Sequence, residues 1–549
     1  MDKPVNIKDE TDVIGIRALP KRQVYITFGG VMLAMFLGSL DQTIVGTAMP
    51  QIISDLGGFT HYTWVTISYM IASTVAVPIA GKLIDMYGRK KLYLVGLGIF
   101  ILGSLLSGLS QTMMQIIFFR GFQGIGAGIM IANAFTVIGD LFPPGERGKY
   151  QGIISAVFGV SSIVGPALGG FLTDSLSWHW VFYVNIPLGI MVVVLFIFFF
   201  PDIRSRSSKY GVDYGGVATL ILAVVPAMLA LSWGGIDYPW LSAQIIGMFA
   251  FSIVMFVIFV IIEKRSKNPI IPLSLFKNKI VAISEIVVFL TAIGMFGTII
   301  FVPLFFQGVL GVSATTSGGF ITPMMLGMVL GSFISGQILS RAGGHYRIQG
   351  AIGLIIMAVG MFLLSRMTLE TSYVMAIVNV VITGFGLGIT MPLYVIAVQN
   401  TVSYEILGVA TSSIAFFRSI GGSVGLAIFG SVVNNRFAAS FMDALSPSAK
   451  AMIPHEQLEY LVHNPQALVS VEAQAQLEDM FSSFGAQGTA LFDQVMQVLR
   501  QSLDFALSEV FLVGVGVLGV AFIVNMFIKE VPLRKHHVLS ESETSPKNK

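Results

Sequence analysis

A few ionisable side chains lie inside long apolar runs of the sequence, where a charge has no water to solvate it. They are Asp41, Arg120, Glu285, Arg418 and Glu509. An ionisable group in hydrocarbon costs at least about 2.5–3.5 kcal/mol on insertion scales, so each of them is a candidate functional residue by default. The chemistry open to such groups is uptake and release of a proton, formation of a buried ion pair, or contact with a charged ligand.

The spacing of Asp41 and Arg120 places them at a similar membrane depth. Asp41 lies about 17 residues into its run, roughly 25 Å from the start, and Arg120 lies about seven residues, roughly 10 Å, into a run of opposite direction. Burial favours the protonated carboxyl, whereas a nearby cation favours the carboxylate. A movable Arg120 or a cationic substrate could therefore control the proton on Asp41. The alternative is a permanent ion pair that only holds two helices together.

The other ionisable residues each allow two interpretations. Glu285 is close to the start of its run and is either a proton or substrate site or an anchor at the membrane interface. Arg418 is deeper and needs an acceptor from helix carbonyls, a substrate or a carboxylate, whereas Glu509 is more typical of the outer interface. We expect proton coupling at Asp41, Arg120 and Glu285. We expect the substrate cavity to include the following residues: Asp41, Gln123, Asn133, Glu285, Gln307 and Arg418.

The composition indicates which elements must position these residues. Of the 549 residues, 54% are hydrophobic and 11% are charged, against roughly 45–50% and about 25% in soluble domains. Apolar runs recur from Val24 to Ile528, and about fourteen of them approach the ~20 residues that a membrane-spanning helix needs. The sequence therefore predicts an all-α membrane protein with fourteen transmembrane helices.

The same sequence argues against several other classes of protein. A net charge of +3 does not suggest nucleic-acid binding, and the absence of cysteine excludes disulfides and thiolate metal sites. Glycines at 121, 124, 126 and 128 superficially resemble a nucleotide loop, but no strand precedes them and no phosphate-binding lysine follows. With no Walker loop, His/Glu metal pair or nucleophile elbow, we expect neither an ATP-driven pump nor an enzyme, and no cofactor or metal. Residues 1–23 lack the features of a signal peptide.

The distribution of lysine and arginine predicts the orientation. Placing the N-terminus in the cytoplasm puts most of the 32 basic residues on that side, as the positive-inside rule requires. An even number of helices then returns the C-terminus to the cytoplasm. The connection 434–502, between apolar runs at 407–433 and 503–529, would lie outside. Its apolar spacing suggests a partly helical lid or hairpin, although a surface excursion that lengthens the last helix is an equal alternative.

Several sequence patches resemble the major facilitator superfamily, and in particular its fourteen-helix drug/proton antiporter branch. GKLIDMYGRKK, from Gly81, is similar to the superfamily's loop motif between helices 2 and 3, and RGFQGIGAG, from Arg120, to the helix 4 motif. GVSSIVGPALGG, from Gly159, is similar to the helix 5 antiporter motif, which favours export over uptake. LDQTIVGTAMP, WHWVFYVNIPLG and FFRSIGGSVG, from Leu40, Trp178 and Phe416, resemble that branch.

The resemblance implies two six-helix bundles that rock about a central cavity, with helices 7 and 8 inserted between them. It assigns a cytoplasmic latch to Gly81, Asp85, Gly88, Arg89 and Lys90, and the helix 5 motif to Gly159, Gly165, Pro166, Gly169 and Gly170. The domains would be a cytoplasmic segment 1–23, a first bundle 24–200, inserted helices 201–279, a second bundle 280–529 that includes 434–502, and a cytoplasmic tail 530–549. Where the loop motif recurs, Ser340 replaces the acid, so the latch is asymmetric.

The expected function is export of a hydrophobic or amphiphilic small molecule in exchange for protons, with the proton gradient as the energy source. Helix 13 lacks an acid near Arg418, which weakens the case for multiply charged cations as substrates. Export of a lipid or glycolipid is the alternative within transport, and a non-transporting receptor or scaffold is a third. The expected partners are the substrate, protons and membrane lipids, for a monomer in the cell membrane.

Overall fold

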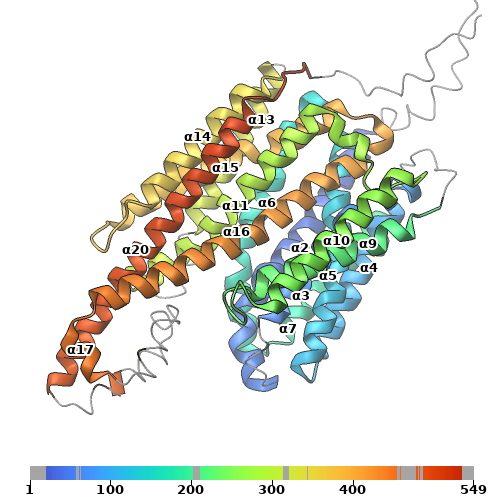
Figure 1. Ribbon diagram of the computed structural model, residues 1–549. Coiled ribbons are helices and arrows are strands. Elements are labelled where there is room, and N and C mark those ends of the chain that lie inside the picture. The colour runs from blue at the N-terminus through green and yellow to red at the C-terminus, as the bar shows by residue number, and fades with distance from the viewer. Residues whose placement is uncertain are drawn as a thin grey trace, which may run out of the picture.

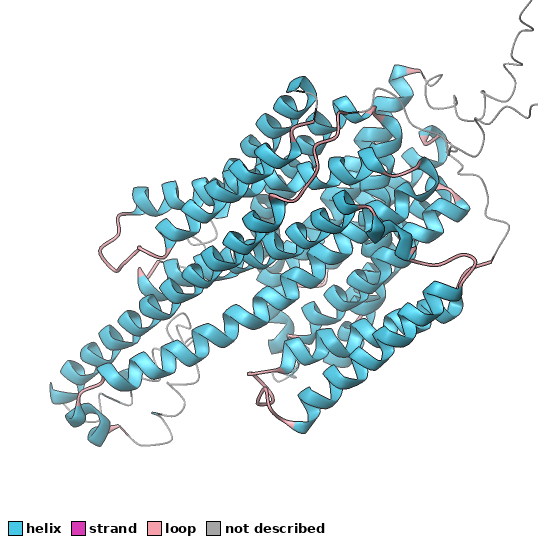
Figure 2. Ribbon diagram, turned by 45° about the horizontal axis from the view of Figure 1, so that its top comes forward, coloured by secondary structure: helices cyan, strands magenta, loops and turns pink. Residues whose placement is uncertain are grey.

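The structure is a computed structural model that describes residues 20–56, 61, 63–201, 211–312, 321–342, 344–453, 458, 478–479, 481 and 486–533. Within these ranges, fourteen helices are long and apolar enough to cross a bilayer. Figures 1 and 2 show them as a bundle of long helices joined mostly by short connections. The predicted all-helical fold with fourteen spans is confirmed. Most of the segment 1–23 and of the tail 530–549 lies outside the described residues.

The first six spans form the N-terminal group of helices. Their bounds are α2 Lys21–Leu56, α3 Trp64–Tyr87, α4 Arg89–Gly108, α5 Met113–Leu141, α6 Pro144–Ser175, and α7 Trp180–Tyr183 with α8 Asn185–Phe199, which together form one span. Two apolar clusters inside this group include Leu97 and Val137 in one and Ile44 and Phe182 in the other. The helices therefore have a core of their own as well as lipid around them.

The last six spans form the C-terminal group. Their bounds are α11 Lys279–Leu304, continued by the π-helical turn η3 Phe305–Val309, then α13 Ile321–Ala342, α14 Tyr346–Leu364, α15 Tyr373–Thr401, α16 Leu407–Ala444 and α20 Ala486–Asn525. Short 3-10 turns precede two of them, η2 Leu273–Lys277 before α11 and η4 Tyr404–Ile406 before α16. A large apolar cluster that includes Met357, Phe429 and Leu507 fills this group.

Two further spans, α9 Tyr214–Trp233 and α10 Ala243–Arg265, lie against the N-terminal group. Asp213 and Ser242 cap them by accepting hydrogen bonds from backbone N–H groups of the first turn. Helix α9 contacts both α3 and α16. Between these three helices lies a cavity of 220 Å³, whose lining includes Met70, Met228 and Leu426.

Helices α16 and α20 continue beyond the apolar runs at 407–433 and 503–529. Helix α16 reaches Ala444, the short helix α17 covers Pro447–Met452, and α20 begins at Ala486. In Figure 1 these segments form an arm that projects past the other helices. The expectation of helical structure in 434–502 is therefore confirmed at both ends of the connection. Most of residues 454–485 lie outside the described residues.

The two groups of helices meet closely at one end of the molecule. We call it the latch end, because Asp85 and Arg89 lie there, and the opposite end the far end. The backbones of Gly148 in α6 and Gly336 in α13 touch, so that a Cβ at position 148 would lie 2.5 Å from the Gly336 Cα. Further along the same pair of helices, the hydroxyls of Ser155 and Ser332 are 2.9 Å apart.

Helices α3 and α16 make the second close contact between the groups. A Cβ at Gly81 would overlap the Ser412 side chain, and the hydroxyls of Thr74 and Ser419 are hydrogen-bonded. Beyond this pair, toward the far end, the 220 Å³ cavity separates α3 from α16. The described contacts therefore close the seam at the latch end and leave it looser at the far end.

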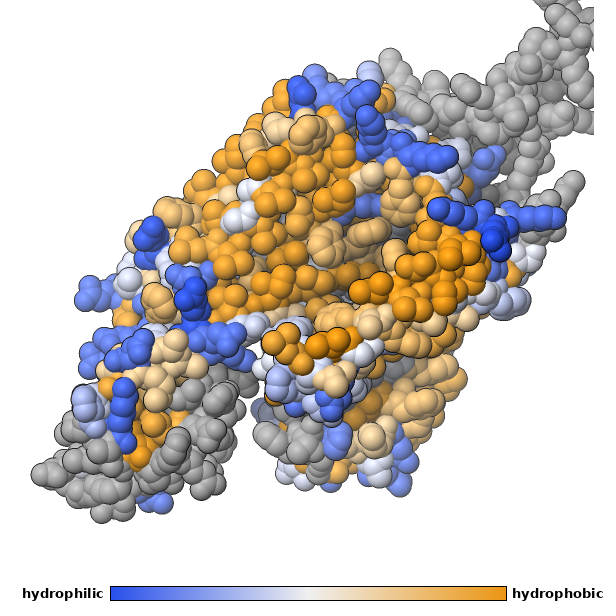
Figure 3. All heavy atoms as spheres, viewed as in Figure 1, coloured by the Kyte–Doolittle hydropathy of each residue, from blue (hydrophilic) through white to orange (hydrophobic). Residues whose placement is uncertain are grey.

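The outer surface fits a hydrocarbon solvent. Figure 3 shows apolar residues covering the flank of the helices, with hydrophilic residues gathered toward the ends. Large side chains such as Phe118 and Phe198 are more than two-thirds exposed. A bilayer rather than water accounts for such a surface, because soluble proteins rarely expose apolar patches of this extent.

Candidate functional site

Asp41 lies at the centre of a buried polar network in the N-terminal group. Its side chain is inaccessible to solvent. The Arg120 Nη1 donates to Oδ2 at 2.6 Å, and the amide nitrogens of Gln123 and Asn185 donate to Oδ1 at 2.8 and 2.7 Å. The predicted proximity of Asp41 and Arg120 is thus observed, and Gln123 belongs to the same site.

Helix positions explain how this network assembles. Arg120 and Gln123 are one turn apart on α5, where residues three positions apart face the same side, and Arg120 also donates to the Gln123 Oε1 at 2.9 Å. Glycines let α5 approach its neighbours: Gly103 of α4 lies against the Gln123 backbone, and Gly124 lies against the backbone of Tyr69 in α3. The motif glycines therefore serve close helix packing.

The donors around Asp41 match an ionised carboxylate. All three neighbours present N–H groups to its oxygens, and a carboxylate is an acceptor only. Arg120 also has apolar support, since its guanidinium lies 4.2 Å from the Tyr69 ring centroid and 5.9 Å from that of Phe182. A proton on Asp41 would remove the charge that Arg120 neutralises and would displace one of these donors. The charge of Asp41 and the positions of its three donors are therefore linked.

Glu285 forms a second buried carboxyl site, in the C-terminal group. Its side chain is 1% exposed, and the Ser413 Oγ donates to Oε1 at 2.5 Å. The other oxygen, Oε2, has no hydrogen-bond partner among the described residues. Glu285 thus lies between α11 and α16 rather than at the surface.

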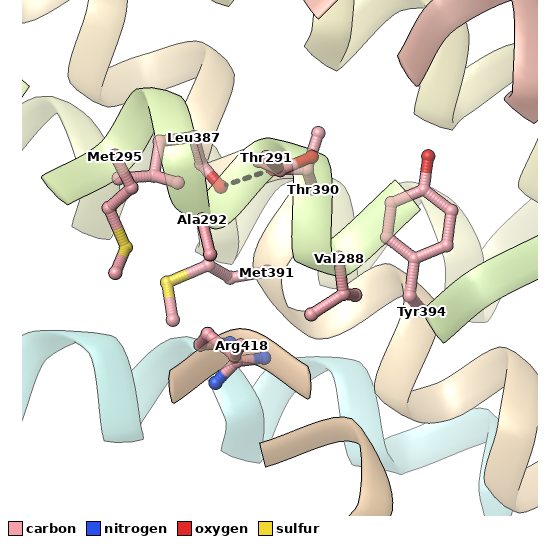
Figure 4. A pocket seen from close by; sticks show the side chains of 9 residues that line it. All are labelled: Val288, Thr291, Ala292, Met295, Leu387, Thr390, Met391, Tyr394 and Arg418. Carbon is pink, nitrogen blue, oxygen red and sulfur yellow. Dashed lines mark hydrogen bonds between the residues drawn. The ribbon is translucent and has the colours of Figure 1, made fainter. Parts of the chain in front are cut away.

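Arg418 lies on the seam between the two groups of helices. Figure 4 shows it on α16, across from side chains of α11 and α15 that include Val288, Thr291 and Met391. Together they line a small cavity of 10 Å³. On the side of the N-terminal group, the guanidinium lies 5.9 Å from the ring centroid of Phe135.

The remaining cavity candidates lie apart from these sites. Asn133 donates from Nδ2 to the carbonyl oxygen of Arg89 at 2.8 Å, so it belongs to the latch end. Gln307 lies on η3, at the other end of the α11–η3 span from Glu285. The residues expected to line one substrate cavity therefore lie at separate places in the fold. Glu509 pairs with Arg436 at 3.9 Å, in a partly exposed position.

The latch residues connect the two groups of helices. The Asp85 carboxylate accepts hydrogen bonds from the backbone N–H groups of Gly408 and Val409, at 3.1 and 2.9 Å. It thereby caps α16, whose first turn has no cap of its own. Arg89 pairs with Asp85 at 3.2 Å and with Asp140 at 2.8 Å, and its side chain is fully buried. An ionic cluster of α3, α4 and α5 thus holds the start of α16.

The glycines of the latch have separate roles. Gly88 has φ +92°, in the left-handed region where glycine is favoured, and Gly81 makes room for Ser412. Lys90 does not join the cluster, because its Nζ donates to the carbonyl oxygen of Ile197 at 2.8 Å. The Ser340 side chain lies outside the described atoms.

The glycine and proline motif of α6 faces two helices. Gly165 and Gly169 lie against Thr43, Ile44 and Thr47 of α2, whereas Gly159 contacts Met325 of α13. Pro166 lies inside the helix, where proline removes a backbone hydrogen bond. A Cβ at Gly170 would meet open space. This helix therefore joins the N-terminal group to the C-terminal group along one seam.

Sequence reasoning missed several residues of these sites. Asn185, Asp140 and Tyr404 were not singled out, although Tyr404 lies 5.6 Å from the Arg89 guanidinium. Arg147 is fully buried and donates to the carbonyl oxygens of Phe142 and Gly139, at 3.0 and 2.5 Å. For Asn185 the available signal was its place within the patch WHWVFYVNIPLG. The others are polar residues next to apolar runs, a pattern too common to identify a site without contacts.

A comparison with known protein families agrees with the helical fold described above. The family model described as Major Facilitator Superfamily matches residues 31–211 and 214–426, most of the chain. The chain belongs to the major facilitator superfamily. This match confirms the family predicted from the sequence motifs, together with its fold. It also confirms the prediction that the chain is a transporter rather than an enzyme.

Two relatives in the superfamily are similar over most of their length. The multidrug transporter protein MdtP of Bacillus subtilis is 42% identical over 95% of this chain and 96% of that protein. Multidrug resistance protein 3 of the same organism is 44% identical over 76% of this chain and 81% of that protein. Among solved structures, the proton:xylose symporter XylE has a TM-score of 0.55 at 12% identity, over 94% of this chain and 98% of that one. That likeness shows the shared major facilitator fold.

Proposed function

We propose that this protein is a proton-coupled antiporter that exports hydrophobic or amphiphilic small molecules. Its relatives are named a multidrug transporter protein and a multidrug resistance protein, and its mostly apolar, methionine-containing seam is of the adaptable kind that accepts varied ligands. The observation that carries the proton-coupling part is the Asp41 network. A solvent-inaccessible carboxylate is held there by one cation and two amides.

In this proposal, Asp41 binds the exchanged proton. Protonation neutralises the carboxylate and releases Arg120, whose charge then rests against the Tyr69 ring. Asp41 lies on α2, which packs against the glycine face of α6, and α6 in turn contacts α13 of the other group. A change at Asp41 is thereby connected to the seam between the groups. Glu285, with one unpartnered oxygen, is the second proton site that we propose.

The latch and seam supply the alternating part of the cycle. The described contacts close the latch end, which on the predicted topology is cytoplasmic. We propose that the two bundles, 24–200 and 280–529, rock about the seam as units, with 201–279 inserted between them. The protein would work as a monomer in the cell membrane, with both termini in the cytoplasm. Gly159, Gly165, Pro166 and Gly169 would let α6 bend while it stays packed.

Reconstituted protein tests this function directly. Proteoliposomes with a pH indicator inside should show substrate-dependent proton movement with a panel of hydrophobic fluorophores of different charge. Asp41→Asn, which keeps the shape but not the charge, should abolish it. Asp55→Asn is the matched control, because Asp55 is an exposed carboxylate on the same helix that accepts a hydrogen bond from Trp178. Full proton movement per substrate in Asp41→Asn would show that Asp41 is not the coupling site.

A further inference from the structure

The guanidinium of Arg418 is a cation at membrane depth without a counter-charge. Arg418 lies on α16 about 16 Å from its first residue, at 1.5 Å per residue. In the part of the chain that the structure describes, no hydrogen bond or ion pair joins it to an acceptor, and its recorded neighbour is the Phe135 ring. A guanidinium has five N–H donors, and a charge in this position is costly. Because the Arg418 side chain is partly exposed, these N–H groups are open to an acceptor that is not part of the described protein.

Three buried carboxylates of the described N-terminal helices are engaged elsewhere. Asp41 pairs with Arg120 at 2.6 Å, and Asp85 and Asp140 pair with Arg89 at the latch end. Asp85 in addition accepts hydrogen bonds from the backbone of Gly408 and Val409, so these carboxylates have partners other than Arg418.

Glu285 is the remaining buried acid near the same seam. Its Oε1 accepts from Ser413, and it forms no described ion pair with Arg418 although both residues lie at the α11–α16 contact. Glu285 is also not among the residues that line the cavity beside Arg418. The charge that faces the cavity is therefore positive.

The other polar groups around the cavity cannot replace Arg418 as donors. The hydroxyls of Thr291 and Thr390 donate to the carbonyl oxygens of their own helices, at 2.7 and 2.9 Å, and the latter bond is visible in Figure 4. The Tyr394 hydroxyl is bonded to the Asn525 side chain at 2.9 Å. The free N–H groups that face this space therefore belong to Arg418.

The surroundings of Arg418 are mostly apolar. The cavity next to it has a volume of 10 Å³ and holds about one water molecule, so a larger head group requires the side chains around it to move. Apolar side chains, Met295 and Met391 among them, line the cavity with Arg418, and the Phe135 ring centroid lies 5.9 Å from the guanidinium on the side of the N-terminal group. An amphiphilic molecule would place its charged head at Arg418 and its apolar body against these side chains.

We propose that Arg418 binds the carboxylate of the exported molecule, and that the preferred substrates are amphiphilic organic acids. The inference rests on the proposed function, since it names the substrate class of that transport site. Arg and a carboxylate form a charge-assisted, often bidentate pair. The same cation repels a quaternary ammonium head, so cationic amphiphiles bind less well than neutral ones.

Three matched probes test this assignment: a dansyl-labelled alkyl carboxylate, its carboxamide and the corresponding alkyl trimethylammonium. Binding to purified protein in nanodiscs at pH 7 is measured by fluorescence, without any gradient. The carboxylate should bind about tenfold to a hundredfold more tightly than the carboxamide, the range expected for a hydrogen bond to a charged group. Arg418→Gln should remove that preference, and Arg418→Lys should keep part of it, since lysine keeps the charge but not the planar fork.

A control lies on the same helix. Arg436 is 18 residues further along α16, five full turns of a helix with 3.6 residues per turn, and pairs with Glu509 in a partly exposed position. Arg436→Gln changes the net charge equally and should leave the preference intact. Equal binding of carboxylate and carboxamide to the unaltered protein would overturn the proposal. So would a preference that survives in Arg418→Gln or disappears in Arg436→Gln.

Two further measurements separate a folding defect from a loss of binding, and the acid assignment from the antiport. If Arg418→Gln does not fold, judged by size-exclusion profile and melting temperature, the probe series on the unaltered protein and on Arg418→Lys decides the question. Because binding needs no proton gradient, it is independent of antiport. Proton-driven export of the carboxamide without carboxylate preference would refute the acid assignment alone, whereas carboxylate preference without any proton movement would refute the antiport alone.

Discussion

Asp85 allows the closure of the latch end to be weakened by a change of one charge. Its carboxylate caps α16 through two backbone N–H groups and pairs with Arg89. Asp85→Asn keeps one acceptor oxygen but loses the charge, so both the pairing and the interaction with the helix dipole are reduced. Taking about 1.5–3 kcal/mol for one charge-assisted hydrogen bond and about 0.3–1 kcal/mol for the dipole, the closed state loses about 2–4 kcal/mol.

This loss corresponds to a shift of about 30-fold to 700-fold in the equilibrium between closed and open latch ends, at 1.4 kcal/mol per factor of ten. If the open form is about 1% of the unaltered protein, it would rise to about a quarter or more. The lower limit applies if the asparagine keeps one of the two backbone contacts at full strength.

Pulsed electron spin distance measurements can detect this population. The chain contains no cysteine, so spin labels can be placed singly at chosen positions without removing native thiols. Lys149 of α6 and Arg341 of α13 are exposed residues near the Gly148–Gly336 contact. With labels at both, the unaltered protein should give one short distance, and Asp85→Asn should add a longer one.

The control is again Asp55→Asn, at the far end of α2. It should leave the distance distribution as it is in the unaltered protein, since Asp55 contacts Trp178 and not the seam. An unchanged distribution in Asp85→Asn, in both detergent and nanodiscs, would contradict the assignment of the latch as the element that holds this end closed.

Two other predictions follow from close contacts and from burial. Gly336→Val should slow transport and lengthen the same label distance, because a side chain at 336 has no room against the Gly148 backbone; normal rates with an unchanged distance would contradict this. Burial lowers the pKa of His179, an effect that Asp55 partly opposes, so the unfolded chain takes up this proton more readily. Stability present at neutral pH should therefore fall as the pH drops through the ordinary histidine range near 6.5. His179→Gln should reduce that fall in melting temperature, and an identical pH profile would refute it.

The transmembrane helices and the polar residues inside them could be predicted from the sequence, because both follow from local rules. Apolar length predicts a span, and the rise per residue is enough to put Asp41 and Arg120 at one depth. The pair is observed at 2.6 Å. Nothing local predicts that the amide of Asn185, in another helix, completes the site, because that depends on how α8 packs. For the same reason Lys90, assigned to the latch by resemblance, lies against α8 instead.

Two helices extend beyond the ends that the apolar runs predict. Membrane thickness restricts where a helix is apolar but not where it stops, since an amphipathic continuation can remain helical in water or on a partner. Helices α16 and α20 continue in this way, with buried contacts such as Phe437, Phe441 and Leu499 within the arm. The residues expected to line one substrate cavity lie at separate places in this structure for a related reason: depth along a helix does not specify which face a side chain occupies.

Helix α9 touches one helix from each half of the molecule, α3 and α16. If the two groups of helices rock as we propose, α9 has to slide over one of these neighbours or move with the other. Substitutions on the faces of α9 that touch α3 and α16 would then alter how readily this side of the seam opens, although α9 belongs to neither group.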